Sequence, residues 1–435
     1  MVMNSRNNEK KIAIVGAGIA GLQCAKILIN NGFNVTVFDK ESEVGGRMRT
    51  SEIDGFLLDH GFHVLQTAYP ETSKQIDYKS LGCKPFKPGA RVVLVKDGKA
   101  RMKLMADPWR DPLRGVLSSL NGFLSIKDLL RIGLMRLSIT KGKIDQLFDG
   151  GDGTTLDFLQ KRKLSDHAIN RFFLPLFGGI FLESKLQTSE RLFRFIFRMM
   201  AKGKMVLPKD GIQSVPLSIA KEIGQDNIRL GVEISRIEEK ALRFRGEAHR
   251  FDLVIKAFAE PTDEDGKHVW TIHFDAPSSP MRSKHILLNT NLIDSSSIVS
   301  HVAVPSDIQP SYAPSGRSLV TATVVGDRAK EMGFETRESV EEAVRNDLGE
   351  WFGDGTVSTW KTLGVQHITH ALPISSSGKR LTNLPKNGED SIECGDHMLH
   401  GSVEGAILSG RNSALIAINR LTNDTETIQG PTKKV

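Results

Sequence analysis

Cysteine is scarce in this chain, and long uncharged apolar runs are lacking. The 435 residues include three cysteines, Cys24, Cys83 and Cys394, which are too few for a disulfide framework. No segment is long and uncharged enough to span a bilayer as a helix. The residues before Lys11 are few and polar, without the apolar region of a secretory signal. We therefore expect a cytoplasmic protein with no transmembrane helix.

Tyrosine and tryptophan are also few, with three and four residues, whereas phenylalanine occurs 21 times. Lys and Arg number 58 against 51 Asp and Glu, which gives a formal net charge of +7. These basic residues form no stripe interleaved with aromatic side chains and match no nucleic-acid-binding module, so we expect no nucleic acid partner. We also expect no metal site. A chain of 435 residues is long enough for two or three lobes with substantial cores.

A glycine-rich turn near the start is the first informative feature. The run Ile12 to Val15 is apolar and largely β-branched, which is typical of a buried parallel strand. Gly16, Gly18 and Gly21 follow it as G-x-G-x-x-G. In this motif the first glycine permits a tight turn, the second lets a pyrophosphate approach the backbone, and the third lets a helix pack on the strand.

The residues after this turn complete a dinucleotide-binding pattern. We predict a helix from about Ala20 to Asn30, whose N-terminal N–H groups point at phosphates. A second strand is predicted from Asn34 to Phe38, and Asp39 ends it. An acid at this place accepts hydrogen bonds from an adenosine ribose. By itself this pattern is compatible with either NAD or FAD.

A second glycine motif follows almost at once, with Gly45-Gly46-Arg47 and then Asp59-His60-Gly61. This combination resembles the flavin-containing amine oxidoreductase superfamily, which includes monoamine and polyamine oxidases, protoporphyrinogen oxidase and phytoene or carotene desaturases. The resemblance implies FAD as the cofactor. A second glycine turn and a fixed arginine supply further donors to the same pyrophosphate.

The segment from 394 to 414, CGDHMLHGSVEGAILSGRNSA, is a third match to this superfamily. The resemblance implies that Gly395 and Asp396 bind the ribityl and phosphate oxygens. It also implies that Val403 to Ala406 begin a helix whose N-terminus faces the flavin, where negative charge develops on reduction. Cys394 stands in a different local context from the cysteine of covalent flavoproteins, so we expect non-covalent FAD.

The complete set of cofactor-binding residues implied by the resemblance includes the backbone of Val232, which would meet the adenine, and the residues around the flavin. The set is Gly16, Gly18, Ile19, Ala20, Gly21, Asp39, Lys40, Gly45, Gly46, Arg47, Gly61, Phe62, His63, Val232, Gly395, Asp396, Val403 and Ala406.

The resemblance covers essentially the whole chain and implies an α/β fold. We expect a Rossmann-like, glutathione-reductase-like FAD-binding domain, interleaved with an α+β substrate domain that has a helical portion. The FAD-binding domain is predicted to be discontinuous, comprising residues 1–85, 205–261 and 365–435. The substrate-binding domain is predicted to comprise 86–204 and 262–364.

Two basic, apolar segments lie in the predicted substrate domain. Residues 112–143 place Val116, Leu117, Leu120, Phe123 and Leu124 on one helical face, and leucines at 129, 130, 134 and 137 extend it. Residues 191–204 have a similar composition. Such segments either lie on an anionic membrane surface, with Lys and Arg reaching the headgroups, or pack on the sheet as ordinary amphipathic helices. The sequence leaves both alternatives open.

The substrate is less well determined than the cofactor. Amine-oxidising members usually place aromatic residues beside the flavin, yet residues 391–411 contain no Phe, Tyr or Trp. Trp360 or a phenylalanine from another part of the chain could take the place of these aromatic residues. The phenylalanine-rich stretch 172–183 has two interpretations: it either lines a substrate tunnel or belongs to the core. His63 is a candidate general acid or base, and Lys267 is a candidate for positioning a water near the flavin; the alternative is that Lys267 is a solvated loop lysine.

We therefore predict an FAD-dependent oxidoreductase nearer to the desaturase branch. It would transfer a hydride from a lipophilic, isoprenoid or ring-conjugated substrate to the flavin N5, and O2 or a quinone would reoxidise the flavin. Contact with the inner face of a membrane would be peripheral. The alternatives are an amine or amino-acid oxidase that produces imine and hydrogen peroxide, and a non-redox flavin protein or pseudoenzyme. The sequence does not indicate an oligomeric state.

Overall fold

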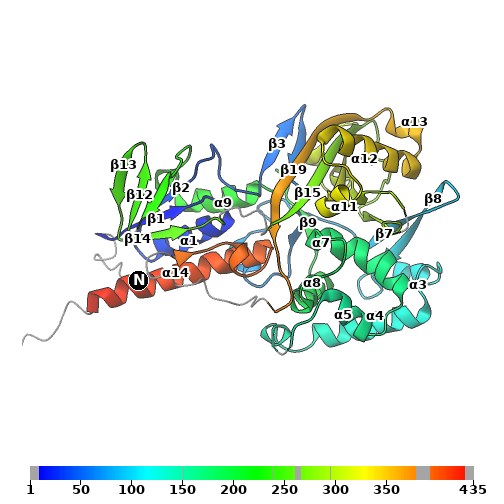
Figure 1. Cartoon of the computed structure of the whole chain (residues 1–435), viewed down its shortest axis with the longest axis horizontal. Coiled ribbons are helices and arrows are strands. Elements are labelled where there is room, and N and C mark those ends of the chain that lie inside the picture. Colours follow the sequence, from blue (N-terminus) through cyan, green and yellow to red (C-terminus); the bar gives the residue numbers. More distant parts are fainter. Residues whose placement is uncertain are drawn as a thin grey trace, which may run out of the picture.

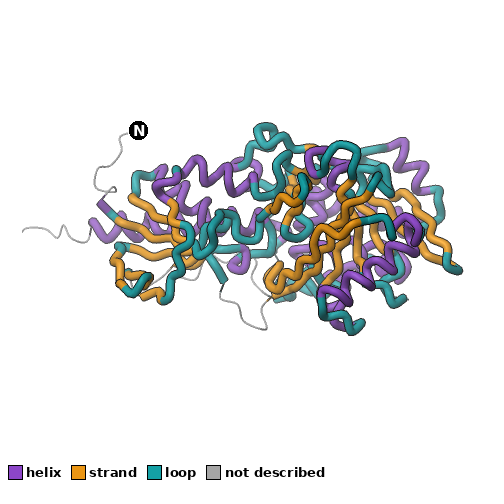
Figure 2. Tube along the Cα trace, turned by 90° about the horizontal axis from the view of Figure 1, so that it is seen from above, coloured by secondary structure: helices purple, strands orange, loops and turns teal. Residues whose placement is uncertain are grey.

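The computed structural model describes residues 9–149, 151–238, 240–259, 266–293, 295–378 and 392–426. Most of the polar head before Lys11 and the predicted domain boundary at residue 261 lie outside these residues. The molecule is elongated, and two lobes lie side by side along its long axis (Figures 1 and 2). Each lobe contains a β-sheet with helices packed on it. The fold is therefore mixed α/β with parallel and antiparallel sheets, which agrees with the predicted α/β fold class.

A five-stranded parallel sheet forms the centre of one lobe, with the strand order β10-β2-β1-β14-β20. Apolar side chains of β1 alternate between two cores, because the sheet is covered on both faces. Helices α1, α9 and α14 pack on one face, and a small antiparallel sheet packs on the other. The elements are β1 (Lys11–Val15), β2 (Asn34–Phe38), β10 (Ile228–Arg229), β14 (Leu253–Lys256), β20 (Ile392–Glu393), α1 (Ile19–Asn30), α9 (Ser214–Ile223), α14 (Val403–Glu426), β11 (Arg236–Glu238), β12 (Ala241–Phe244) and β13 (Glu247–Arg250).

A seven-stranded sheet forms the centre of the other lobe, with the order β19-β15-β18-β17-β16-β7-β8. Only the β16–β7 pair is parallel among its described pairings. Helices α11 to α13 cover one face, and the helices between residues 112 and 202 lie on the opposite side (Figure 1). The strands are β7 (Gly89–Lys96), β8 (Lys99–Ala106), β15 (Gly266–Ala276), β16 (Ile286–Asn289), β17 (Val299–Ala303), β18 (Ser318–Val325) and β19 (Lys361–Pro373).

Short strands and the remaining helices connect the two lobes. The strands pair as β3 (Thr50–Ile53) with β4 (Phe56–Asp59), and as β5 (Leu65–Gln66), β9 (Met205–Leu207) and β6 (Lys84–Pro85). The other helices are α2 (Thr72–Gln75), α3 (Pro112–Ser119), α4 (Ile126–Thr140), η2 (Asp145–Leu147), α5 (Thr155–Lys161), α6 (Asp166–Ala168), the π-helix η3 (Ile169–Gly178), α7 (Gly179–Phe181), α8 (Glu190–Lys202), η4 (Gln225–Asn227), α10 (Pro305–Ile308), η5 (Pro310–Tyr312), α11 (Gly326–Glu331), α12 (Arg337–Phe352), α13 (Asp354–Val357) and η6 (Asp396–Met398).

The amphipathic segment 112–143 is two helices, α3 and α4, and its single predicted face is partly wrong. Phe123 and Leu124 lie in the connection between the helices and are buried against β7 and β16. Most of the other apolar side chains face solvent, and we call them the apolar face of α3 and α4. This face consists of Trp109, Leu113, Val116, Leu117, Leu120, Ile126, Leu130, Leu134 and Leu137, which are 46–77% exposed.

The second amphipathic segment, α8, belongs to the core, so the membrane interpretation of residues 191–204 is wrong. Its apolar side chains pack against those of η3, including Phe173 and Phe177. The stretch 172–183 therefore contributes mainly to a core. Arg198 is buried in α8 and donates to the carbonyl oxygens of Lys141 and Gly142, just beyond the end of α4. No helix in the described ranges is long and apolar enough to cross a membrane.

Candidate cofactor and active site

The first glycine turn has a geometry that requires glycine at two of its three positions. Gly16 adopts a φ of +114°, and a Cβ there would lie 2.7 Å from the carbonyl oxygen of Ala257. A Cβ on Gly21 would lie 2.0 Å from the carbonyl oxygen of Gly16. At Gly18, by contrast, a Cβ would meet nothing within 4 Å. The turn therefore packs tightly on β14 and α1 and leaves open space beside Gly18.

Asp39 lies next to this turn, as the sequence predicts. One carboxylate oxygen accepts from the backbone N–H of Ala17 at 2.6 Å, and the other accepts from that of Glu41 at 3.0 Å. The backbone N–H of Val232 donates to the Asp39 carbonyl oxygen at 2.9 Å. Lys40 is exposed beside them. The structure thus places Asp39 and Val232 together, and their contacts with an adenosine stay a prediction.

The second glycine turn packs on the first, backbone to backbone. Gly45 donates its N–H to the carbonyl oxygen of Ala17 at 2.9 Å and forms a bridge with Gly18. A Cβ on Gly46 would lie 3.4 Å from the Cα of Gly18. Gly45 itself requires glycine, because its φ is +124° and a Cβ there would lie 2.5 Å from the carbonyl oxygen of Met48. The two motifs at the start of the chain therefore form one surface.

Arg47 joins this surface to the distant C-terminal motif. Its guanidinium donates to the Asp396 carboxylate at 2.5 Å and to the carbonyl oxygen of Ala371, at the end of β19, at 2.7 Å. Asp396 is buried, whereas the Arg47 side chain is 43% exposed. A cation that is anchored at one end and open to solvent can also bind a phosphate oxygen.

The C-terminal motif begins helix α14 at Val403, as predicted, with Ala406 in its first turn. A Cβ on Gly410 would lie 2.2 Å from the carbonyl oxygen of Ala20, so α14 packs directly on α1. Gly395 has a φ of +148° and donates its N–H to the Ser409 hydroxyl at 3.0 Å. These contacts bring the third motif against the first.

Glu404 is a residue of this motif to which the sequence analysis assigned no role. Its buried carboxylate accepts from the backbone N–H of Glu71 at 2.9 Å, and from the N–H and hydroxyl of Thr72 at 2.8 and 2.7 Å. An acid among the apolar residues of a helix start was a visible signal, since a buried carboxylate needs such partners. Glu404 therefore fixes residues 71–72 to the start of α14.

Gly61, Phe62 and His63 lie between the two lobes. Gly61 has a φ of +94° and donates its N–H to the side-chain oxygen of Gln366, in β19, at 3.1 Å. The Nε2 of His63 lies 2.9 Å from the carbonyl oxygen of His60. Desolvation lowers the pKa of His63, so this imidazole is neutral near pH 7 and donates to that carbonyl. The acid or base role of His63 stays a prediction.

Lys267 is the second residue of β15, and its assignment as a solvated loop lysine is wrong. Its Nζ lies 3.2 Å from a carboxylate oxygen of Glu183, and the two side chains are 17% and 4% exposed. Lys267 pairs in the sheet with Leu372, the residue after the Ala371 that binds Arg47. Lys267 is therefore one strand away from the junction of the three motifs, and its catalytic role stays a prediction.

A row of polar side chains crosses four strands of the seven-stranded sheet. Gln366 of β19 is opposite Thr271 of β15, which is opposite Thr323 of β18, which is opposite His301 of β17. Directly opposite residues share one face of a sheet. We call Gln366, Thr271, Thr323 and His301 the polar row.

The polar row faces the Gly61–His63 segment, because Gln366 accepts from Gly61 and the His301 ring lies 5.1 Å from the Phe62 ring. The hydroxyls of Thr271 and Thr323 and the Nε2 of His301 are buried and have no hydrogen-bond partner among the residues that the structure describes. Burial lowers the pKa of His301 to about 4, so it is neutral near pH 7. Buried polar atoms without partners are rare and mark a place where a ligand or water supplies them. The sequence analysis missed this row.

Aromatic side chains do reach the C-terminal motif, but from other parts of the chain. Tyr69 stacks on Phe195 with ring centres 5.9 Å apart, and Phe195 lies 5.2 Å from the His400 ring. Trp360, the substitute named from the sequence, instead packs with Phe274 in the core under α12. Tyr69 and Phe195 therefore place aromatic rings beside His400 of the C-terminal motif.

Comparison with known proteins agrees with this arrangement. A model of the family described as "Flavin containing amine oxidoreductase" matches residues 19–280 and 264–417. Mitochondrial protoporphyrinogen oxidase from Nicotiana tabacum is 22% identical over 96% of this chain and 96% of its own length. A 4,4'-diapophytoene desaturase from Methylomonas sp. is 48% identical over 12% of this chain and 11% of its own length.

A solved structure of cyclohexylamine oxidase from Brevibacterium oxydans has the same fold, with a TM-score of 0.69 and 16% identity over 95% of this chain and 99% of its own. The match to the family model covers nearly the whole chain, including the motifs around Gly45, Gly61 and Gly395 that meet in the structure. The chain belongs to the flavin-containing amine oxidoreductase family and is an FAD-dependent oxidoreductase.

Proposed function

We propose that FAD binds non-covalently from Val232 and Asp39, past Gly18 and Gly46, to Arg47 and Asp396. The residues present fit this cofactor. The first turn of α1 has no side-chain cap, so its N–H groups are free to bind phosphate oxygens. The space beside Gly18 is open, and Arg47 is half-exposed at the end of this line. We also propose that each of these residues has the cofactor-binding role that the resemblance implies, and that this lobe is a Rossmann-like domain.

The division into two domains is part of the same proposal. The parallel sheet takes its strands from residues 11–38, 228–256 and 392–393, which supports a discontinuous FAD-binding domain. One boundary is better placed later than the predicted residue 365. Strand β19 continues in the seven-stranded sheet to Pro373, so we assign residues up to 373 to the substrate domain.

We propose that the enzyme removes a hydride from a lipophilic substrate that also carries N–H or O–H groups. The bound FAD supplies the two-electron acceptor, and O2 or a quinone takes the electrons in turn. The polar row is the observation that carries this proposal. A purely hydrocarbon substrate would leave the hydroxyls of Thr271 and Thr323 and the Nε2 of His301 buried without partners, at a cost of about 1–3 kcal/mol each. A ring-conjugated molecule with N–H groups, such as a porphyrinogen, would satisfy them.

The polar row is uncharged, which also favours a substrate with neutral N–H or O–H groups. None of its four residues carries a charge when His301 is neutral, so the row does not compensate a protonated amine. Glu183, which contacts β15 through Lys267, is already neutralised by this ion pair. The amine oxidase alternative is favoured instead by the stacked rings of Tyr69 and Phe195 beside the C-terminal motif. It therefore remains the second candidate.

Anaerobic bleaching of the bound flavin distinguishes these functions. We expect a porphyrinogen to bleach the flavin absorbance faster than small amines or carotenes. Bleaching by amines alone would establish the second candidate, and bleaching by none of these classes would refute both. In the presence of the active substrate, Thr323→Val should raise KM about fivefold or more, since one hydrogen bond is lost. Thr155→Val is the matched control, because Thr155 is equally buried but bonds to Thr188 within the helical region.

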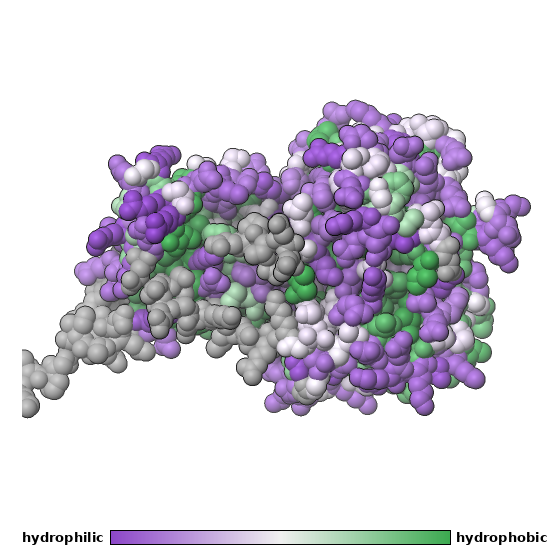
Figure 3. All heavy atoms as spheres, in the orientation of Figure 1, coloured by the Kyte–Doolittle hydropathy of each residue, from purple (hydrophilic) through white to green (hydrophobic). Residues whose placement is uncertain are grey.

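We also propose that the protein binds membranes peripherally. Nine large apolar side chains on and beside two consecutive helices are 46–77% exposed, whereas soluble proteins rarely expose apolar side chains in such a group. Figure 3 shows hydrophobic atoms at the surface at its lower right, over α3 and α4. Trp109 belongs to this face, and tryptophan favours the membrane–water interface. A lipophilic substrate dissolved in a bilayer would reach the enzyme from this side.

A further inference from the structure

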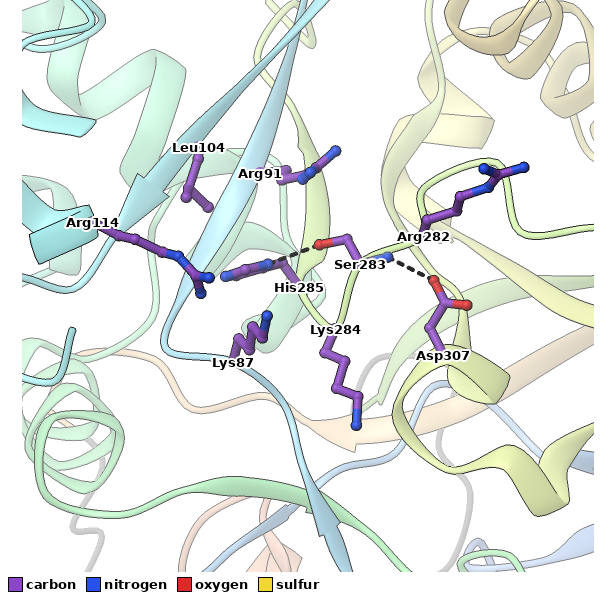
Figure 4. Close-up of a pocket in the computed structure, with 9 residues that line it drawn as sticks. All are labelled: Lys87, Arg91, Leu104, Arg114, Arg282, Ser283, Lys284, His285 and Asp307. Carbon is purple, nitrogen blue, oxygen red and sulfur yellow. Dashed lines mark hydrogen bonds between the residues drawn. The ribbon is translucent and has the colours of Figure 1, made fainter. Parts of the chain in front are cut away.

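A pocket of about 440 Å³ lies beside the first turn of α3. Its walls come from the start of β7, the side of β8, helix α3 and the loop before β16 (Figure 4). The backbone N–H of Lys87 donates to the carbonyl oxygen of Lys284 at 2.8 Å and joins two of these walls. The lining residues are Lys87, Arg91, Leu104, Arg114, Arg282, Ser283, Lys284, His285 and Asp307.

The lining is strongly cationic, with five Lys and Arg side chains and one acid. Asp307 already accepts from the Ser279 hydroxyl and the Ser283 N–H at 2.7 and 2.8 Å, so it holds the loop. Among the ion pairs of the described residues, Arg114 has one partner, Asp111 at 3.5 Å. Lys87 and Arg91 form no ion pair among the described residues. The pocket therefore holds positive charge that the neighbouring side chains do not neutralise.

His285 lies on the buried side of the pocket, and both its burial and this positive potential lower its pKa. Its Nδ1 lies 2.8 Å from the Ser283 hydroxyl, and the side chains of Arg114 and Lys87 extend toward its ring (Figure 4). Burial, together with the charges of Arg91, Lys87 and Arg114, lowers the pKa of His285 to about 4. An anion bound among these groups would relieve their mutual repulsion.

The pocket borders the apolar face of α3 and α4. Arg114 belongs to α3 and lies between Leu113 and Leu117, which are 76% and 61% exposed. A surface that combines an apolar helix face with cations matches the boundary between acyl chains and anionic headgroups. We infer that this pocket binds the phosphate of an anionic phospholipid headgroup while the apolar face of α3 and α4 enters the same bilayer. The inference rests on the proposed membrane association and adds to it a defined site.

Three double variants of the full-length, FAD-loaded protein test this site. K87Q/R91Q removes two pocket cations. K221Q/R250Q is the matched control, since it removes the same charge from exposed positions on α9 and β13 in the other lobe (Figure 1). L113Q/L117Q reduces the apolar face without changing charge. Flavin absorbance and melting temperature check folding, and the single variant Lys87→Gln, at an exposed position, replaces the first pair if Arg91→Gln unfolds the protein.

Sedimentation with vesicles measures binding to phosphatidylcholine alone and to phosphatidylcholine mixed with phosphatidic acid. We expect tighter binding to the mixed vesicles. K87Q/R91Q should weaken it roughly thirtyfold, because each basic residue at an anionic surface contributes about 1 kcal/mol. K221Q/R250Q should change it less than about threefold, since these side chains do not touch the surface. L113Q/L117Q should weaken binding to both vesicles about tenfold or more.

Three results would overturn the inference. K87Q/R91Q and K221Q/R250Q differ in vesicle binding only if the pocket binds the headgroup, so equal binding by the two variants refutes the inference. Loss of binding in L113Q/L117Q alone would mean an apolar membrane surface without a headgroup site. Binding of glycerol phosphate without binding of vesicles would mean a site for soluble phosphate esters. The proposed function is tested separately, because vesicle binding needs no turnover and flavin bleaching needs no vesicle.

Discussion

Asp59 offers a quantitative test of how this structure holds the segment that leads to Gly61. Its buried carboxylate accepts from the Thr50 hydroxyl at 2.7 Å, the Ile212 N–H at 2.9 Å and the Tyr312 hydroxyl at 2.8 Å. Burial raises its pKa to about 6, although these donors lower it in part. In the unfolded chain an aspartate has a pKa of about 3.9. The native state therefore binds the proton more tightly than the unfolded state does.

The sign of the pH effect follows from this difference. Below about pH 4 the carboxyl is protonated in both states, so it does not lower the free energy of unfolding. Stability falls as the pH rises from about 4 to about 6, because the native state must then ionise a buried group, and it is constant above that range. The two pKa values differ by about 2 units, so the loss is about 3 kcal/mol.

The substitution Asp59→Asn should remove this loss. The asparagine oxygen can accept from Thr50 and Ile212, and its amide can donate to the Tyr312 hydroxyl, so each contact is kept as a hydrogen bond although the one with Tyr312 reverses its direction. We expect the variant to gain about 3 kcal/mol relative to the parent between pH 4 and pH 7. Urea unfolding of both proteins at several pH values measures this difference.

Only the difference between the two proteins is diagnostic. Buried histidines with a pKa lowered to about 4, such as His301 and His400, make stability rise over the same range and oppose Asp59. This contribution is common to both proteins and cancels. A difference that is independent of pH would show that Asp59 is ionised throughout and would refute the reasoning. Tyr312→Phe should shift the transition to higher pH, since it removes one donor to the carboxylate.

Three further predictions concern contacts between segments that are distant in sequence. Glu404→Gln should destabilise the protein by about 2 kcal/mol in urea unfolding, because an amide donor replaces one of the two carboxylate oxygens that accept from Glu71 and Thr72, whereas Thr72→Val should cost about 1 kcal/mol. Arg47→Ala should weaken FAD binding about 10- to 100-fold in a fluorescence titration, and an unchanged affinity would place the pyrophosphate elsewhere. Lys267→Met should destabilise by about 3 kcal/mol, because Glu183 is left buried and unpaired, and adding Glu183→Leu should restore most of this loss.

The arrangement of the cofactor motifs could be predicted because its signals are local. The predicted strand from Asn34 to Phe38 has those bounds in the structure, and the predicted helix start at Val403 is confirmed. Gly21 is required by a backbone contact with Gly16, five residues earlier in the chain, and Gly16 is required by the positive φ of the turn itself. Such constraints leave a mark on the sequence wherever they occur.

The polar row could not be predicted because it depends on strand register. Thr271 and Thr323 are ordinary residues of apolar strands, and nothing near either in sequence indicates that they lie opposite each other. Their pairing, and the approach of Gln366 and His301, joins four segments between residues 266 and 373. A shift of one residue in any strand would turn these side chains to the opposite face. This face of the seven-stranded sheet is therefore defined by the fold more than by motifs.

The same reasoning explains why the amphipathic segments gave two different results. Composition does not separate α8, which is in the core, from α3, which exposes Leu113 and Leu117. What separates them is position. Helix α8 is enclosed by η3, α4 and α5, so its Arg198 is buried and caps carbonyl groups. Helix α3 is at the outer edge beside β8, so its Arg114 turns into an open cationic pocket. An arginine in an apolar helix therefore indicates a membrane surface only when the packing leaves its neighbours exposed.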